Sequence, residues 1–66
     1  MADPIKAFPK RFREAREASG ISTEALARRL HVSRQTVWLW ERGISLPQFS
    51  QLVAIRKVLG FDPLRP

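Results

Sequence analysis

The sequence predicts an all-α domain of four to five short helices. In four segments, apolar residues recur at intervals of three and four, which is the period of an amphipathic helix. Glycine follows three of these segments, where a helix ends easily, at Gly20, Gly43 and Gly60. A chain of 66 residues allows one domain with one core and no large substrate cleft.

The expected helices begin at residues suited to a helix N-terminus. Pro9 fits the first turn of the first helix, because its missing N–H costs nothing there, and Ser22 and Ser33 can cap the next two. The helices are expected at about residues 9–19, 23 to 30 or 31, 34–42 and 48–59. Residues 1–7 are expected to form a flexible N-terminal arm, and residues 8–64 the folded domain.

Residues 22–42 predict a helix-turn-helix, since two short helices joined by so few residues must cross steeply. The second helix of the motif should place Val37 and Trp40 against the core. Four of its side chains would then face outward: Arg34, Gln35, Trp38 and Leu39. An exposed tryptophan next to an exposed leucine is costly unless something covers them, so this face indicates a contact surface.

Composition narrows the classes of function. The net charge is +6, and nine of the twelve basic residues are arginine, which favours a nucleic-acid partner. The chain has no cysteine, His31 is its only histidine, and no nucleophile–base pair or carboxylate pair is evident. We therefore expect no enzyme activity, no cofactor, no metal and no small-molecule ligand. No apolar run approaches the roughly 20 residues of a membrane span, so we expect a cytoplasmic protein with no membrane partner.

The stretch GISTEALARRLHVSRQTVWLWERGISLP, residues 20–47, resembles the helix-turn-helix signature of the lambda repressor and Cro family, also called the XRE family. The matching residues include Gly20, Ile21, Ser22, Leu26, Ala27, Leu30, Val32, Ser33, Thr36, Val37, Trp40, Glu41, Arg42, Gly43 and Pro47. The resemblance implies a lambda-repressor-like DNA-binding domain of five helices, whose third helix enters the major groove. It also implies the residues that read bases, which are Arg34, Gln35, Trp38 and Leu39.

The same resemblance implies further site residues. Those expected to contact DNA phosphate are Thr23, Ser33, Arg42 and Ser45, each of which could instead be a simple cap or a solvated side chain. Arg16 and Glu41 match a pair that joins the first and third helices in this family, so we expect a structural ion pair between them.

The sequence departs from the family pattern at several site positions. Thr23 replaces the glutamine usual at the start of the second helix, which puts in doubt the contact by which that side chain braces the third helix. Trp38 is far larger than the usual residue, and Leu39 has no hydrogen-bonding group. Arg56 stands where a packed alanine is common. These departures shift base reading towards shape and methyl contacts, or indicate that the face meets a protein.

The leading interpretation is a sequence-specific regulator of transcription that binds double-stranded DNA, with a repressor as the expected type, at the nucleoid of a bacterial or phage-host cell. A homodimer on a palindromic operator is the usual family form. Its dimer surface is expected at the end of the fourth helix and residues 61–64, which could equally cover the core. The alternative is a protein-interaction module, antitoxin-like or regulator-binding, that uses Trp38 and Leu39 as its anchor.

Overall fold

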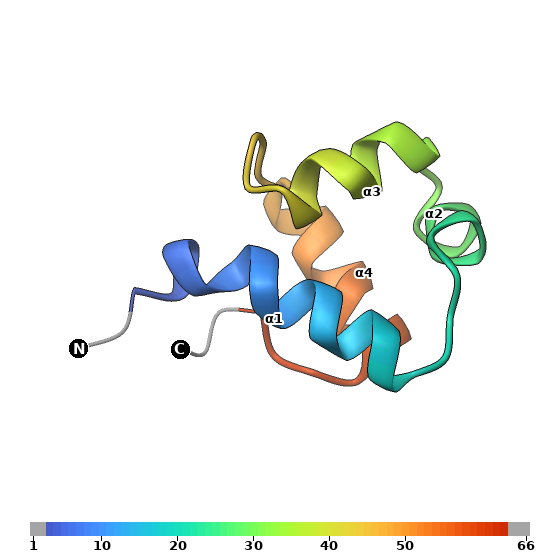
Figure 1. The fold of residues 1–66 in the computed structure, drawn as a ribbon, viewed down its shortest axis with the longest axis horizontal. Coiled ribbons are helices and arrows are strands. Elements are labelled where there is room, and N and C mark those ends of the chain that lie inside the picture. The colour runs from blue at the N-terminus through green and yellow to red at the C-terminus, as the bar shows by residue number, and fades with distance from the viewer. Residues whose placement is uncertain (1–2, 64–66) are drawn as a thin grey trace.

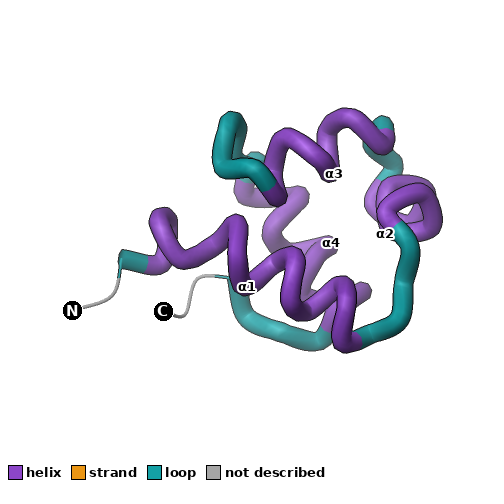
Figure 2. The backbone as a smooth tube through the Cα atoms, viewed as in Figure 1, coloured by secondary structure: helices purple, strands orange, loops and turns teal. Residues whose placement is uncertain are grey.

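The computed structural model describes residues 3–63, which form four α-helices and no strand (Figure 1). In chain order the helices are α1 (Pro4–Ala18), α2 (Thr23–Leu30), α3 (Arg34–Glu41) and α4 (Phe49–Leu59). In Figure 2, α1 and α3 run across the view whereas α2 is seen end-on, so α2 crosses both steeply. The prediction of an all-α domain is confirmed. None of the helices within residues 3–63 has the length and apolarity needed to span a membrane.

The first helix begins earlier than the sequence analysis expected. The Asp3 side chain accepts a hydrogen bond from the backbone N–H of Ile5 at 2.9 Å and so caps the helix, and Pro4 takes its first position. Residues 4–7 of the expected flexible arm are therefore helical, and residues 1–2 lie outside the described part of the chain. Pro9 lies inside α1 and not in its first turn.

Pro9 also helps to join α1 to the end of α3. A Cβ atom placed on Gly43 would lie 3.2 Å from Cγ of the Pro9 ring, and Gly43 has a φ of +72°. Both the close approach and the left-handed backbone favour glycine at this position. The segment after α3 can therefore pass directly over the first half of α1.

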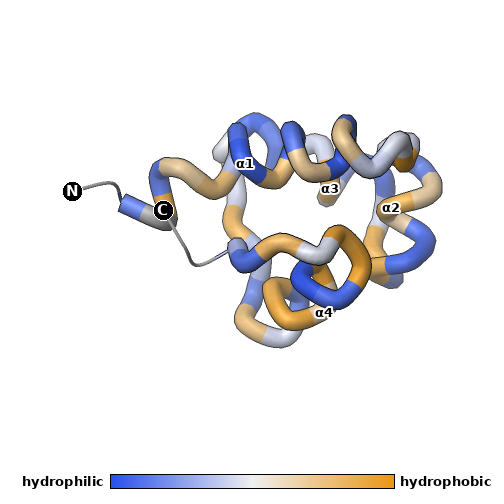
Figure 3. The backbone as a smooth tube through the Cα atoms, turned by 90° about the horizontal axis from the view of Figure 1, so that it is seen from below, coloured by the Kyte–Doolittle hydropathy of each residue, from blue (hydrophilic) through white to orange (hydrophobic). Residues whose placement is uncertain are grey.

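The core lies between all four helices. Its buried members are Phe8, Phe12, Leu26, Ala27, Leu30, Val37, Trp40 and Ile55. Phe12 stacks on Phe8 with ring centroids 5.2 Å apart and meets Trp40 edge-on at 6.0 Å, so aromatic contacts join α1 to α3. Figure 3 shows hydrophilic and hydrophobic residues alternating along α1, whereas α4 is mostly hydrophobic. The predicted inward placement of Val37 and Trp40 is confirmed.

The corner between α2 and α3 is fixed by local hydrogen bonds. His31 adopts the left-handed conformation, with φ 57° and ψ 42°, and ends α2, while the N–H of Val32 donates to the carbonyl of Ala27 at 3.0 Å. The Ser33 hydroxyl then accepts from the N–H of Thr36 at 3.1 Å and caps α3. The two helices start where the sequence predicted, and each ends within one residue of the expected position.

The described chain ends against the core. Gly60, with φ 71°, ends α4, and the partly buried ring of Phe61 packs against the core cluster. The guanidinium carbon of Arg11 lies 5.5 Å from the centroid of that ring. No fifth helix follows α4 within residues 60–63. Leu64, which was expected at the dimer surface or over the core, lies outside the described residues.

Candidate nucleic-acid interface

The outward face of α3 carries the side chains that the sequence analysis assigned to base reading. Arg34 and Gln35 are exposed, and Trp38 has 48% of its surface exposed. Leu39 was expected to face outward but is partly buried, so only part of this side chain is available for contact. The face is held in position from behind, because Val37 and Trp40 on the same helix are buried in the core.

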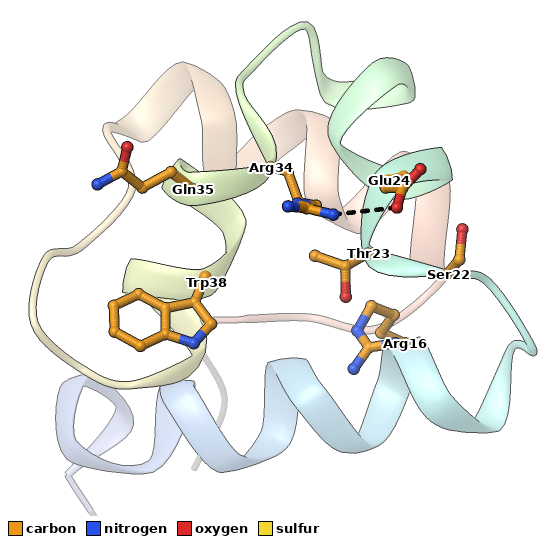
Figure 4. Close-up of a pocket in the computed structure, with 7 residues that line it drawn as sticks. All are labelled: Arg16, Ser22, Thr23, Glu24, Arg34, Gln35 and Trp38. Atoms are coloured by element: carbon orange, nitrogen blue, oxygen red, sulfur yellow. Dashed lines mark hydrogen bonds and ion pairs between the residues drawn. The ribbon is translucent and has the colours of Figure 1, made fainter.

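An open groove of ≈ 720 Å³ lies in front of this face (Figure 4). The residues that line it come from the end of α1, the first turn of α2 and the first half of α3: Arg16, Ser22, Thr23, Glu24, Arg34, Gln35 and Trp38. In the close-up the Arg34 side chain extends towards α2, whereas Gln35 points away from it to the other side of α3. The groove therefore brings three of the four expected base-reading residues together with Thr23.

A hydrogen-bonded ion pair crosses this groove. Nη1 of Arg34 donates to Oε1 of Glu24 at 3.1 Å, and both side chains are well exposed. This contact was not predicted from the sequence. The two residues lie ten positions apart in sequence, on the two helices of the motif, so only the crossing of α2 and α3 reveals it.

The four expected phosphate-contacting residues lie in different settings. Thr23 is half-buried at the first position of α2 and lines the groove. The Ser33 hydroxyl is engaged as the cap of α3 and also shares a 2.8 Å hydrogen bond with the hydroxyl of Thr36. Arg42 is exposed, with its guanidinium carbon 5.1 Å from the centre of the Trp38 ring. Ser45 is half-buried in the loop after α3 and does not line the groove.

The ion pair expected between Arg16 and Glu41 is present at the base of the site. Nε of Arg16 donates to Oε2 of Glu41 at 2.6 Å, and Nη2 donates to Oε1 at 3.4 Å. Nη1 of Arg16 also donates to the carbonyl of Ile21 at 3.2 Å, which ties the α1–α2 loop to the pair. The hydrogen bond and negative charge of Glu41 raise the pKa of the Arg16 guanidinium despite its partial burial.

Comparison with known families shows which family this domain belongs to. A family model described as a helix-turn-helix domain matches residues 8–66. The chain belongs to this helix-turn-helix domain family. The family is of the XRE and Cro-like type, and its members are DNA-binding domains, as the sequence resemblance implied. No curated protein and no solved structure matches the chain.

Within the described part of the helix-turn-helix domain, the chemistry available at the site is that of hydrogen bonds, charge and stacking. The groove offers guanidinium, amide and hydroxyl groups and one indole ring. Among residues 3–63, no group of three acidic or histidine side chains could hold a metal ion. Guanidinium, amide and hydroxyl groups of this kind suit a nucleic acid, whose phosphates and base edges offer acceptors and donors for them.

Proposed function

We propose that this helix-turn-helix domain is a sequence-specific regulator of transcription that binds double-stranded DNA and reads the major groove with α3. The observation that carries the proposal is the face of α3, where Arg34, Gln35 and Trp38 project from a helix whose opposite side is locked into the core. A recognition helix needs one face fixed by packing in the core and an opposite face whose side chains are free to contact bases.

The exposed side chains offer complementary base contacts. Arg34 can donate to both major-groove acceptors of guanine, and the Gln35 amide can pair with the acceptor and donor of adenine. Since these two side chains point to different sides of α3, they would contact different base pairs (Figure 4). Trp38, with the accessible part of Leu39, would contact a thymine methyl group. Each good bidentate pair discriminates against a wrong base by about 1–3 kcal/mol.

Contacts with phosphate would supply most of the affinity. Thr23 and Ser33 lie at the N-terminal ends of α2 and α3, where unpaired backbone N–H groups attract anions. Arg42 and Ser45 follow α3 in the chain and would contact the DNA backbone beyond the C-terminal end of this helix. The net charge of +6 adds a long-range attraction, so binding should weaken steeply as salt is added.

As a repressor, the protein would act by occupying a palindromic operator as a homodimer in the cytoplasm. Phe61 was one of the residues expected at the dimer surface, but it packs against the core and beneath Arg11. Four exposed apolar side chains offer a second place for two copies to meet: Ile44, Leu46, Phe49 and Val53. Residues 43–55 carry no charged side chain, so a contact through this segment would bring none of its own side chains into like-charge pairs.

Selection of bound duplexes from a random pool tests the proposal. A DNA-reading domain should enrich one half-site, and its affinity for that site should fall about 10³-fold or more between 50 and 200 mM salt if it makes six or more phosphate contacts. Arg34→Ala and Gln35→Ala should each relax the preference at one base pair. If no sequence is enriched and both variants bind like the wild type, the proposal is wrong.

Trp38 also favours a second candidate, a protein-interaction module. Tryptophan is enriched at the anchor positions of protein interfaces, and nearly half of this side chain is exposed. Against this, the guanidinium of Arg42 lies beside the indole and places a positive charge where phosphate would pass. The same titration separates the two: weak binding that neither variant alters would favour a protein partner.

A further inference from the structure

Glu24 is an acidic side chain in a groove whose other charged members are Arg16 and Arg34. Its hydrogen bond with Arg34 joins the first turn of α2 to the first residue of α3 (Figure 4). The two side chains remain 70% and 69% exposed, and pairs of this kind contribute little to stability. Any effect of Glu24 should therefore be sought in binding.

We infer that Glu24 determines specificity as a positioning residue: it holds Arg34 ready for guanine and weakens binding to the DNA backbone alone. The inference rests on the proposed function, since it requires DNA to lie against the exposed face of α3. It goes further by assigning a role in discrimination to a residue of α2 that need not contact a base.

The geometry of the pair supports the first part of this role. Arg34 uses only Nη1 to reach Glu24, and its other guanidinium N–H groups bond to no residue within the described chain. A guanidinium has five N–H donors in one plane, so enough remain for the two acceptors of guanine. An arginine already held at one nitrogen has fewer orientations to lose when it binds, which favours a planar, two-point partner.

The charge of Glu24 supports the second part. A carboxylate on the DNA-facing side of the protein is repelled by every phosphate near it, whatever the base sequence. At a guanine, Arg34 can keep its contact with Glu24 while its free N–H groups bind the base. A phosphate that draws Arg34 away leaves Glu24 unpaired beside a polyanion. Glu24 should therefore reduce non-specific binding more than specific binding.

The test compares three duplexes of equal length: the selected site, the same site with the guanine read by Arg34 changed to adenine, and a random sequence. Glu24→Gln keeps the size of the side chain and removes its charge. We expect the guanine preference to fall at least about threefold, out of the roughly 5- to 150-fold that a bidentate pair supplies. Affinity for the random duplex should rise about two- to fivefold.

Glu14→Gln is the matched control, because it makes the same change in net charge at an exposed position on α1. Glu14 lies two residues before Arg16, so it projects from the side of α1 away from the groove. This control should leave the guanine preference unchanged. If it lowers that preference as much as Glu24→Gln does, the effect is one of net charge and the inference is overturned.

A second background separates positioning from repulsion. In Arg34→Ala, adding Glu24→Gln should leave base preference unchanged while still strengthening binding to the random duplex. The inference is overturned if Glu24→Gln alone lowers the guanine preference by less than about threefold, if it does not strengthen binding to the random duplex, or if no guanine in the selected site depends on Arg34. A wild-type protein that binds no duplex would overturn the proposed function as well.

Discussion

Arg16 in α1 and Glu41 in the last turn of α3 are joined by two contacts, at 2.6 Å between Nε and Oε2 and at 3.4 Å between Nη2 and Oε1. Only 16% and 11% of the two side chains is exposed. Removing either partner therefore leaves the other charge largely out of water, which costs more than the loss of an exposed pair. The pair therefore joins the last turn of α3 to α1.

Glu41→Gln should lower the free energy of unfolding by about 2–4 kcal/mol, somewhat less than for a fully buried pair because one edge meets solvent. Urea unfolding followed by circular dichroism measures this loss. Glu24→Gln is the control, since it removes a carboxylate from a well-exposed pair and should cost less than about 0.5 kcal/mol. Equal losses in the two variants would contradict a special role for the pair.

The pKa of Arg16 sets the sign of the pH dependence. A group whose pKa is raised by folding stabilises the protein fully below its unfolded-state pKa, and this stabilisation is lost only as pH rises through the folded-state pKa. For arginine both values lie in the strongly alkaline range. The difference in unfolding free energy between the wild type and Arg16→Met should therefore stay constant between about pH 6 and pH 9. A steady decline of that difference across this range would contradict the assignment.

The two tryptophans should separate binding from stability. Trp40 is 2% exposed and meets Phe12, so Trp40→Ala should cost about 3–5 kcal/mol and leave so small a domain largely unfolded. Trp38→Ala removes a half-exposed ring and should change stability by less than about 1 kcal/mol while weakening DNA binding. Acrylamide quenching of fluorescence offers a direct check: Trp38 should be quenched in the free protein and shielded by bound DNA.

Local signals explain why the helix-turn-helix was predictable and the start of α1 was not. Ser22 and Ser33 cap α2 and α3 through their own side chains, so the sequence marks both starts. Asp3 and Pro4 form an equally local start signal, but Pro9 offered a competing one. α1 nevertheless continues through Pro9, whose ring lies so close to Gly43 that a Cβ atom placed there would come within 3.2 Å of its Cγ, and this tertiary arrangement leaves no local signal in the sequence.

The sequence could predict which side chains of the candidate site lie on the exposed face of each helix, but not the contacts between helices. Periodicity places Gln35 opposite the buried Val37 and Trp40, and Arg34 at the edge of the exposed face, because side chains of one helix have fixed directions around its axis. It cannot say which side chains meet across a turn, so the bond from Glu24 to Arg34 was missed. The partial burial of Leu39 likewise depends on the tertiary surroundings of α3 and not on its period.

The backbone at His31, in the corner between α2 and α3, is strained, and a substitution can relieve this strain. His31 has a φ of 57°, and no other non-glycine residue in the described part of the chain has a positive φ. His31→Gly should raise the free energy of unfolding by about 0.5–1 kcal/mol, because glycine adopts this conformation without the clash of a Cβ atom. His31→Val should lower it by at least as much, since a β-branched side chain is worse there. Thermal unfolding of the two variants should move in opposite directions, and a shift of both in one direction would contradict the strain.

Arg42 should contribute to DNA affinity without contributing to base preference. It follows α3, and its guanidinium is held near the Trp38 ring and open to solvent, a position from which it can reach a phosphate. Arg42→Ala should reduce the slope of log affinity against log salt by about one and weaken every duplex by a similar factor. Lys57→Ala removes the same charge from the exposed side of α4, outside the groove, and should leave the slope nearly unchanged. If Arg42→Ala instead altered the preferred bases and kept the slope, Arg42 would have to be assigned to base reading through its contact with Trp38.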